Sequence, residues 1–536
     1  MKMNLFVTVF VLLSLVLVGC SDSTTGISEE DRESALENLN DEGFPIVNEK
    51  IEVEGFAAKF FAAQDWNNLM LWEEYEKKSN IKVNWETVTT EVLAERRNLK
   101  LASGDYPEIM FASALSRTDL AQYGNQGTFI ALNELIDLYA PNFKKIMEEY
   151  PIVEKGITMP DGNIYGFPAI FDPDFKGLHI GTPWINKEWL ENLELEEPKT
   201  LEELYEVLTA FKEQDPNGSG KDDVIPWGGV SINGVINYLR GAFELNNRGV
   251  ANLHIDQDPQ TGNVRFIPTT DNYKQLLEYV NKLYSEGLID QEIFTIAYHE
   301  FTSKGTQGIY GVINGIDPGT LMNLEGYVGL PVLEGINGKR LNTAIGSPLG
   351  NIGMFVITDK AKNPEAMVRW IDYFYGDEGA KNFFLGFEGI TYIETEDGVY
   401  EYTEEITNNP DGLNLDQAIS QYLTWPGGFY PGIVKEQYFK GAEGNEASRA
   451  RAEKAEPYTL DMNEVWPVFN FTLEEHEELT VIQNDINTYV EESTAEFVTG
   501  RRSFSDWDNY VNQLERMGLN RYLEIIQAAY ERYLEE

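Results

Sequence analysis

Three strand patterns, each leading into a helical pattern, constrain the fold of this chain more than any other feature. Between the first two strands, Leu69, Trp72 and Tyr75 recur at helical spacing. Strands that alternate with helices are typical of a parallel sheet with crossover helices, so we predict an α/β fold. The expected strands are 51–58 (IEVEGFAA), 81–88 (IKVNWETV) and 108–113 (EIMFAS).

The length of the chain predicts more than one core. Its 536 residues exceed the roughly 250–300 residues at which single cores stop growing, so we expect two or three domains. Later helices have clear start signals. Thr200 with Glu203 and Thr472 with Glu475 have the spacing of capping boxes, and Asn363 precedes a proline.

The ends of the predicted strands are the first candidate site. In sheets of this kind, ligands bind beyond the carboxyl ends of the strands. Asp65, Trp66 and Asn67 come soon after the first strand, and Ser113 ends the third. We therefore predict that these four residues contact a ligand.

The charge balance excludes two classes of partner. The chain has 89 Asp and Glu residues against 41 Lys and Arg, a formal net charge of −48. Such a surface repels nucleic acid and anionic lipid headgroups, so neither is an expected partner.

The first twenty residues predict export and a lipid anchor. Residues 5–18 are an apolar run of 14, too short for a helix of about 20 residues that crosses a bilayer but suited to a signal peptide. The run ends in Leu17-Val18-Gly19-Cys20, which resembles the bacterial lipobox. Cys20 is the only cysteine, so no internal disulfide can form. We expect a signal peptide at 1–20, a diacylglyceryl and palmitate anchor on Cys20, and an acidic tether at 21–48.

Several further motifs, taken in order, carry a family resemblance. Together they resemble the family 1 extracellular solute-binding proteins of ABC importers, and most closely the lipoprotein subgroup that includes alginate-oligosaccharide-binding proteins. The motifs are LASGDYPEIMF (101–111), MPDGNIYGFP (159–168), WINKEWLENL with EPKTLEELYEVL (184–208), KNPEAMVRWIDYFY (362–375) and GFEGITYIETEDGVYEYT (386–403).

The resemblance implies a two-lobed α/β fold of the periplasmic-binding-protein type II class, with a hinge and an interlobe ligand cleft. We expect one lobe from 49–172 plus 316–346 and the other from 173–315 plus 347–536. The implied function is capture of an oligosaccharide and its delivery to the permease subunits of an ABC importer. We expect a monomer on the outer face of a Gram-positive cell membrane.

Residues 215–223 (DPNGSGKDD) predict a calcium loop. Ca²⁺ takes six to eight oxygen ligands, and alternating polar side chains with intervening glycines can surround it. By resemblance to the family pattern, the ligands are Asp215, Asn217, Ser219, the carbonyl of Lys221, and Asp223. Val224 departs from that pattern, since relatives carry Glu there. The alternative is an ordinary acidic turn bent at Asn217-Gly218.

Aromatic residues flanked by polar residues or glycines are the other ligand candidates. Sugars pack their CH faces on aromatic rings and pair their hydroxyls with polar groups. The candidates of this kind are Trp227, Trp425, Phe429 and Tyr430, with Arg240 and Asp317 as polar additions. For a uronate ligand, Arg117, Lys176 and Arg240 could form a basic cluster, although they could equally be isolated surface cations.

The alternatives to transport are an enzyme and a sensor. Four histidines with no zinc-protease helix, no GxSxG elbow and no complete phosphate-binding loop argue against a hydrolase. A glycosidase needs only two carboxylates, and the chain has 89, so a polysaccharide-degrading enzyme stays open as the weaker alternative. A lipid-anchored component that reports ligand to a membrane sensor would use the same closing cleft.

Overall fold

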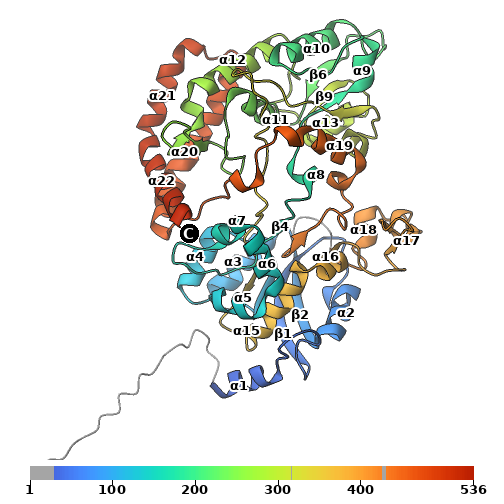
Figure 1. Cartoon of the computed structure of the whole chain (residues 1–536), viewed down its shortest axis with the longest axis vertical. Helices are drawn as coiled ribbons and strands as arrows, with labels where there is room; N and C mark the ends of the chain where they lie inside the picture. Colours follow the sequence, from blue (N-terminus) through green and yellow to red (C-terminus); the bar gives the residue numbers. More distant parts are fainter. Residues whose placement is uncertain (1–28, 316, 425–429, 536) are drawn as a thin grey trace, which may run out of the picture.

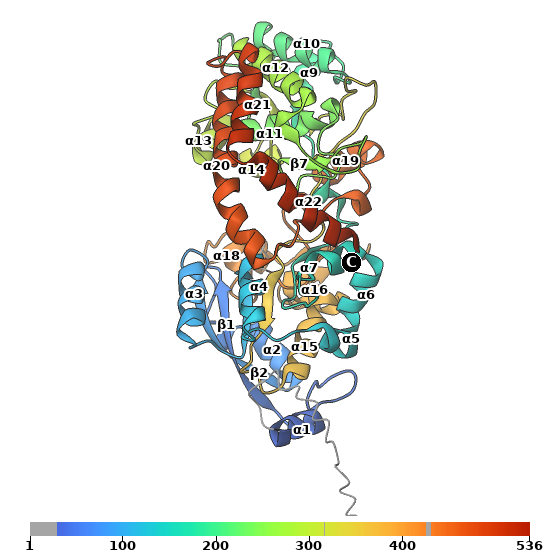
Figure 2. The same cartoon turned by 90° about the vertical axis from the view of Figure 1, so that its left-hand side faces the viewer.

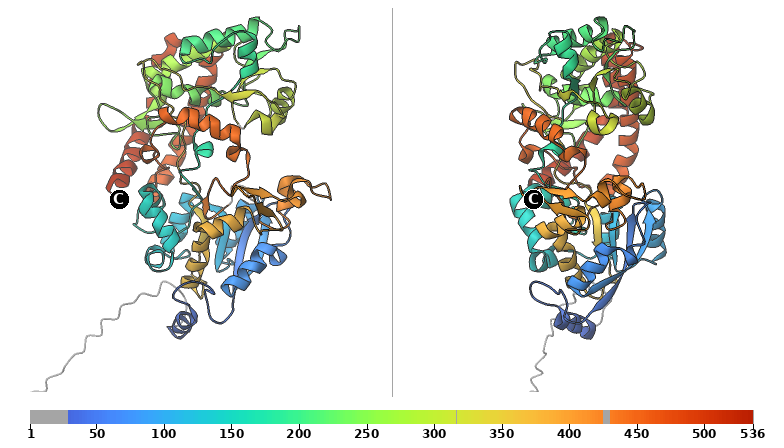
Figure 3. Two further views of the ribbon diagram at one scale, coloured as in Figure 1. Left: turned by 45° about the vertical axis from the view of Figure 1, so that its right-hand side comes forward. Right: turned by 90° about the vertical axis from the view of Figure 1, so that its right-hand side faces the viewer.

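A computed structural model describes residues 29–315, 317–424 and 430–535 (Figure 1). The predicted signal peptide, Cys20, Trp425 and Phe429 lie outside the described residues. The chain forms two lobes that lie one above the other along the long axis (Figures 1 and 3). No helix in the described ranges combines the length and the apolar character that crossing a membrane requires.

The first lobe is built on a sheet in the order β11-β3-β1-β2. Strands β1 and β2 are parallel along their whole length, from Ile51 beside Ile81 to Lys59 beside Thr89, and β3 also runs parallel to β1. All three predicted strands are thus confirmed. The fourth strand, β11, is antiparallel to β3. The bounds are β1 Ile51–Lys59, β2 Ile81–Thr89, β3 Ile109–Leu115 and β11 Gly353–Ile357.

Helices cover this sheet on both sides. Helix α2 buries Trp72 and Tyr75 as the helical spacing predicted. The helices of this lobe are α1 Glu29–Asn38, α2 Met70–Ser79, α3 Leu93–Ser103, α4 Arg117–Asn125, α5 Asn133–Tyr139, α6 Pro141–Glu149, α7 Pro151–Ile157, α15 Pro364–Asp372, α16 Asp377–Phe384, α17 Glu404–Thr407 and α18 Leu415–Ile419; β12 Tyr392–Glu394 and β13 Tyr400–Tyr402 form a hairpin beside them.

The second lobe has its own sheet, in the order β10-β5-β9-β6. Its strands are β5 Trp184–Asn186, β6 Ile225–Gly228, β9 Tyr310–Ile313 and β10 Tyr327–Gly329, with a separate hairpin of β7 Ile255–Gln257 and β8 Val264–Phe266. Its helices are α9 Lys187–Asn192, α10 Leu201–Glu213, α11 Ile232–Leu239, α12 Asp271–Ser285, α13 Tyr298–Gly305, α14 Pro318–Met322, α19 Glu446–Ala455, α20 Leu473–Val498, α21 Trp507–Arg516 and α22 Leu519–Glu535. The predicted capping box is present at Thr472 and Glu475, where α20 begins.

Each lobe has its own hydrophobic core, and the chain enters each lobe twice. The first core draws on residues from Ile46 to Phe175 and from Leu349 to Tyr438, and the second on residues from Ile185 to Leu333 and from Trp466 to Tyr530. The expected assignment of chain segments to the two lobes is therefore wrong after the first crossing. Residues 317–346 lie in the second lobe because β10 pairs with β5, and β11 brings residues 349–424 and 430–438 into the first.

Three chain segments meet at the hinge between the lobes. Strand β4 (Ile170–Phe171) pairs in parallel with β14 (Ile433–Val434). A bridge between Ile170 and Leu349 adds the third segment. A short helix, α8 (Lys176–His179), follows β4 toward the second lobe. The expected boundary after residue 172 lies at this hinge and the one after residue 346 lies near Leu349, whereas the one after residue 315 lies inside the second lobe.

The described part of the predicted tether, residues 29–48, packs on the first lobe. Helix α1 occupies much of it, and Ile46 and Val47 are 1% exposed in the first core. Arg369 of α15 donates to the carbonyl oxygen of Gly43 at 2.7 Å. Acidic composition suggested a tether, but the apolar pair at its end anchors this stretch by burial.

A second contact joins the lobes at the start of α20. Asn470 donates from Nδ2 to the carbonyl oxygen of Gly156 at 3.1 Å and accepts a hydrogen bond from Arg117. Thr118 Oγ1 lies 2.9 Å from His476 Nε2. Figure 2 shows α20 descending to α4 and α22 descending to the region of α7. We call the set Arg117, Thr118, Gly156, Asn470 and His476 the rear contact.

Candidate functional site

The loop after β1 forms one rim of the candidate site. Phe61 lies there with 64% of its surface exposed, beside Phe60 with ring centroids 4.5 Å apart. Gln64 Nε2 donates to Gln421 Oε1 at 2.8 Å, and Gln421 donates to the carbonyl of Ala62. An exposed aromatic ring and two amides thus gather at the carboxyl end of β1, where parallel sheets bind ligands.

The three predicted residues in this loop serve its local structure. Trp66 is 1% exposed and packs against Trp72 and Trp85 in the first core. Asp65 accepts from the backbone N–H of Asn67 and caps a short 3₁₀ turn. Asn67 bonds both backbone groups of Trp85, at 2.9 Å and 2.8 Å. In this conformation the Trp66 ring offers no face to a ligand, and Asp65 and Asn67 remain on the exposed rim.

The end of β3 is held in a strained conformation. Ala112 and Ala114 have φ values of 51° and 46°, which residues other than glycine rarely adopt. Arg97, from α3, donates to the carbonyls of Ser113 and Ala114, both at 2.7 Å. The predicted Ser113 is fully buried and donates to the carbonyl of Gly353 at 3.0 Å. Strain of this kind gathers at functional sites, and here it lies at the predicted strand end.

In the second lobe, Trp227 and Arg240 are also buried. The Trp227 ring is 0% exposed, and its Nε1 donates to Asn314 Oδ1 at 3.3 Å. Arg240 donates to Asn246 Oδ1 at 2.9 Å and to the carbonyl of Leu253 at 2.8 Å. Burial lowers the pKa of Arg240 from its usual value. The structure therefore places both residues inside the second lobe.

Asp317 lies after β9, at the carboxyl end of a central strand of the second sheet. It caps α14 and accepts a hydrogen bond from Asn445 Nδ2 at 3.0 Å. Nearby, Arg451 of α19 stacks over the Trp184 ring at 4.4 Å. Burial lowers the pKa of Arg451 to about 10. Polar and aromatic groups from three segments thus meet at this strand end.

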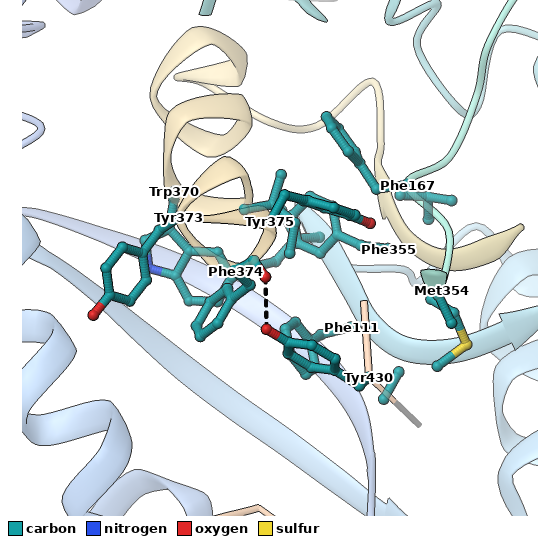
Figure 4. Close-up of a cluster of buried hydrophobic side chains, with 14 of the residues drawn as sticks. Phe111, Phe167, Met354, Phe355, Trp370, Tyr373, Phe374, Tyr375 and Tyr430 are labelled. Atoms are coloured by element: carbon teal, nitrogen blue, oxygen red, sulfur yellow. Dashed lines mark hydrogen bonds between the residues drawn. The ribbon is translucent and has the colours of Figure 1, made fainter. Parts of the chain in front are cut away.

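Tyr430 belongs to the first core (Figure 4). It is 1% exposed, and its hydroxyl donates to the carbonyl of Phe374 at 2.6 Å. Its ring lies 4.0 Å from that of Phe383. Among the predicted aromatics within the described ranges, Trp66, Trp227 and Tyr430 all fill cores, so whether they contact ligand stays a prediction.

Two exposed aromatic residues were missed by the sequence analysis. Phe61 follows β1, and Tyr298, 53% exposed, is the first residue of α13 in the second lobe. The sequence does offer a signal that Phe61 is a ligand candidate: it follows a predicted strand directly and stands next to a second phenylalanine. No comparable signal marked Tyr298, because it opens a helix that also buries Phe301.

A pocket of about 490 Å³ lies at the hinge, between the two lobes. Asp172 and Asp174 come from the segment after β4, and Tyr400 from the β12–β13 hairpin of the first lobe. Lys440 comes from the segment after β14, and Arg449 from α19 of the second lobe. We call this space the hinge pocket.

The cations proposed for a uronate ligand do not gather. Arg117 lies in the rear contact, and burial lowers its pKa to about 10. Lys176 pairs with Glu456 at 2.7 Å, and Arg240 is buried in the second lobe. Each of the three has its own separate partners, so of the two alternatives the structure favours isolated cations over a basic cluster.

The loop of residues 215–223 draws its polar side chains toward one another. Asp223 Oδ1 accepts from Asn217 Nδ2 at 3.1 Å and from Ser219 Oγ at 2.9 Å. Asp215 accepts from the backbone N–H groups of Ser219 and Gly220 at 3.1 Å and 2.9 Å. Gly218 and Gly220 have φ values of 64° and 67°, which allow the sharp turn. The oxygens of this donor set suit a hard cation such as Ca²⁺.

The same loop has few carboxylates. Val224 is partly buried against the second core. No cluster of three or more His, Cys, Asp or Glu side chains able to hold a metal occurs in the ranges that the structure describes. The side-chain oxygens that this loop can offer come from three carboxylates (Asp215, Asp222 and Asp223), one amide and one hydroxyl.

Comparison with known proteins gives matches along most of the chain. Residues 64–381 match the family of bacterial extracellular solute-binding proteins. The chain is 31% identical over 553 residues to FusA, a fructooligosaccharide ABC transporter substrate-binding protein of Streptococcus pneumoniae serotype 4 (strain ATCC BAA-334 / TIGR4), covering 99% of each chain. It is 27% identical over 346 residues to YtcQ, a polygalacturonan/rhamnogalacturonan-binding protein of Bacillus subtilis (strain 168), covering 62% of this chain and 65% of YtcQ.

Solved structures agree with these matches. FusA in complex with kestose superposes with a TM-score of 0.71 at 28% identity, over 90% of this chain and 100% of FusA. An EF-hand mutant of FusA in complex with fructo-nystose gives a TM-score of 0.70 at 28% identity, with the same coverage. The two-lobed α/β fold expected from the sequence is thereby confirmed. On this evidence, the chain belongs to the bacterial extracellular solute-binding protein family.

Proposed function

We propose that this protein captures an oligosaccharide outside the cell and delivers it to an ABC importer. The observation that carries the proposal is the match to FusA along almost the entire length of both chains. The architecture supports it, because two lobes joined by three hinge segments can close around a ligand. The exposed Phe61 and Tyr298 would offer ring faces to sugars, one from each lobe.

Delivery would need a membrane anchor and a partner. Cys20 would carry the lipid and hold the protein at the outer face of the cell membrane, where the permease subunits of the importer receive the closed, liganded form. The protein would act as a monomer and release its ligand unchanged, since its relatives are named as binding proteins rather than enzymes.

The loop of residues 215–223 would hold a structural Ca²⁺. Asp215, Asn217, Ser219 and Asp223 would supply side-chain oxygens, with the carbonyl of Lys221. The existence of an EF-hand mutant of FusA supports this assignment. Bound calcium would fix the turn between α10 and β6 and would take no part in sugar binding.

A thermal-shift screen of residues 21–536 against neutral and acidic oligosaccharides tests the proposal. A ligand present at 100 times its Kd should add about 2.7 kcal/mol of stability. A clear rise in Tm with at least one sugar, and unchanged sugar after long incubation, is the expected result. Hydrolysis of the sugar, or no shift with any oligosaccharide, would contradict it.

A further inference from the structure

The hinge pocket is built by both lobes and by the hinge itself. Tyr400 belongs to a hairpin of the first lobe, whose ring packs against the first core. Arg449 lies on α19, which packs in the second lobe. Asp172, Asp174 and Lys440 lie on the segments that leave the paired hinge strands. A molecule in this pocket would therefore touch every part that moves during closure.

The size of the pocket suits one or two sugar rings. Its volume of about 490 Å³ lies within the range of roughly 300–1,000 Å³ found for small-molecule sites. Tyr400 is only half-buried, so its ring can present a face to a ligand. A ring face beside several polar groups is what a carbohydrate needs, because its CH groups are apolar and its hydroxyls are not.

The charges around the pocket nearly cancel. Two of its three cations are already paired: Lys435 with Asp377 at 3.0 Å and Arg449 with Glu436 at 3.1 Å. Lys440 makes no ion pair or hydrogen bond within the described ranges; burial and the charge of Arg449 lower its pKa, and the carboxylate of Glu401 only partly opposes this. One ammonium group is therefore left to interact with a ligand.

Two further carboxylates, Asp172 and Asp174, line the same pocket. Neither Asp172 nor Asp174 forms an ion pair with a cation in the described ranges, and Asp172 accepts a backbone hydrogen bond from Asp174 at 3.0 Å. Burial, with the nearby charge of Asp174, raises the pKa of Asp172. A carboxylate on the ligand would meet two like charges for each unpaired cation, and such juxtaposition is costly.

Hydroxyl groups suit this arrangement better than carboxylates. The hydroxyls of a sugar ring can donate to Asp172 and to Asp174, and one of them can accept from Lys440, without adding charge. We propose that the hinge pocket holds an uncharged sugar ring of the captured oligosaccharide and discriminates against uronate rings. This inference rests on the proposed function and names the substrate class that the site prefers.

The test compares two variants with two matched controls. Asp174→Asn removes one exposed pocket charge, and Lys440→Gln removes the unpaired cation. Glu492→Gln on α20 and Lys145→Gln on α6 make the same chemical changes at exposed positions outside the pocket. Calorimetry would measure the Kd of each protein for a panel of neutral trisaccharides that includes kestose, and for trigalacturonate.

The wild type should bind a neutral trisaccharide more tightly than trigalacturonate. Lys440→Gln should raise the Kd for the neutral sugar about tenfold, and Asp174→Asn should move selectivity toward trigalacturonate by about tenfold. Both controls should match the wild type. Circular dichroism and Tm of each variant would separate these effects from loss of folding.

Three outcomes would contradict the proposal in different ways. A wild type that prefers trigalacturonate would overturn the stated substrate class. Neutral-sugar binding left unchanged by both pocket variants would overturn the role of the pocket while the proposed function stands. A wild type that bound no oligosaccharide of either class would instead refute the proposed function.

Discussion

Asn470 and Gly156 are joined by a hydrogen bond of 3.1 Å that links the start of α20 to α7 of the first lobe. Figure 1 shows α7 on one side of the hinge strand β4 and α19, which borders the hinge pocket, on the other. The lobes therefore contact each other on the α7 side of the hinge, and the hinge pocket lies between them on the α19 side. Closure around a ligand on the α19 side would have to change the rear contact.

We expect Asn470→Ala to raise sugar affinity about fivefold. Asn470 donates to the carbonyls of Gly156 and Thr158 and accepts from Arg117; a net gain of about 1 kcal/mol from these bonds would be lost, which would destabilise the present conformation relative to the closed one. Asn272→Ala is the matched control, because Asn272 makes the same kind of bond, to the carbonyl of Phe243, within the second lobe. Calorimetric Kd values check this. Equal or weaker binding by Asn470→Ala would show that the rear contact does not oppose closure.

We expect Phe61→Ala and Tyr298→Ala each to weaken sugar binding about tenfold without lowering the Tm. Both rings are more than half exposed, so their truncation removes a sugar-stacking face and leaves the cores intact. Leu138→Ala provides the control, since Leu138 is 71% exposed on α5. Unchanged Kd values in both aromatic variants would exclude these rings from the binding surface.

We expect a calcium chelator to lower the Tm of the wild type but not that of Asp223→Asn. Asp223 is the acceptor on which Asn217 and Ser219 converge, so its charge should contribute most to a cation in this loop. Sugar affinity should stay unchanged, because the loop follows α10, away from the hinge (Figure 1). Identical melting curves with calcium and with chelator would identify the loop as an ordinary turn.

We expect His254→Phe to make the protein more resistant to acid. Burial, with the charge of Arg240, lowers the pKa of His254 to about 3. In the unfolded chain this histidine titrates near pH 6.5, so as pH falls below 6.5 the unfolded state binds the proton first and stability is lost down to pH 3. At pH 5 the loss from this group is up to about 2 kcal/mol.

His254→Phe should remove this loss of stability at pH 5. At pH 7 the substitution should change the free energy of unfolding only slightly. His254 Nδ1 is buried without a hydrogen-bond partner among the described residues, and the ring already lies beside Phe266. Urea unfolding of both proteins at pH 7 and pH 5 checks this. The same drop in stability for both proteins would mean that other groups cause the acid sensitivity.

The strands of the first sheet could be predicted because their signal is local. Strand-length apolar stretches followed by helical spacing fix β1, β2 and β3 without knowledge of the rest of the chain. The partners of β10 and β11 could not be predicted in this way. Both are short apolar stretches, and only tertiary pairing decides that one joins β5 and the other joins β3.

The ligand candidates show a second limit on what can be predicted from the sequence. Polar neighbours suggested that Trp66 stands at an open loop end, but Asp65 caps a turn and Asn67 bonds the backbone of Trp85. Polar residues beside an aromatic ring can therefore serve local structure while the ring itself is buried. The turn of residues 215–223 was more predictable, because its alternating oxygens and glycines lie within nine consecutive residues.

The three hinge segments also affect how the protein withstands extracellular proteases. Because β4, β14 and the segment at Leu349 all run between the lobes, one cut in any of them leaves two covalent connections intact. Each lobe consists of two chain segments, and along the sequence a segment of the other lobe lies between them. A single cut therefore releases neither lobe as a separate fragment. The single cysteine of this chain cannot form an internal disulfide. The three connections between the lobes thus hold the cut protein together, as disulfides do in other exported proteins.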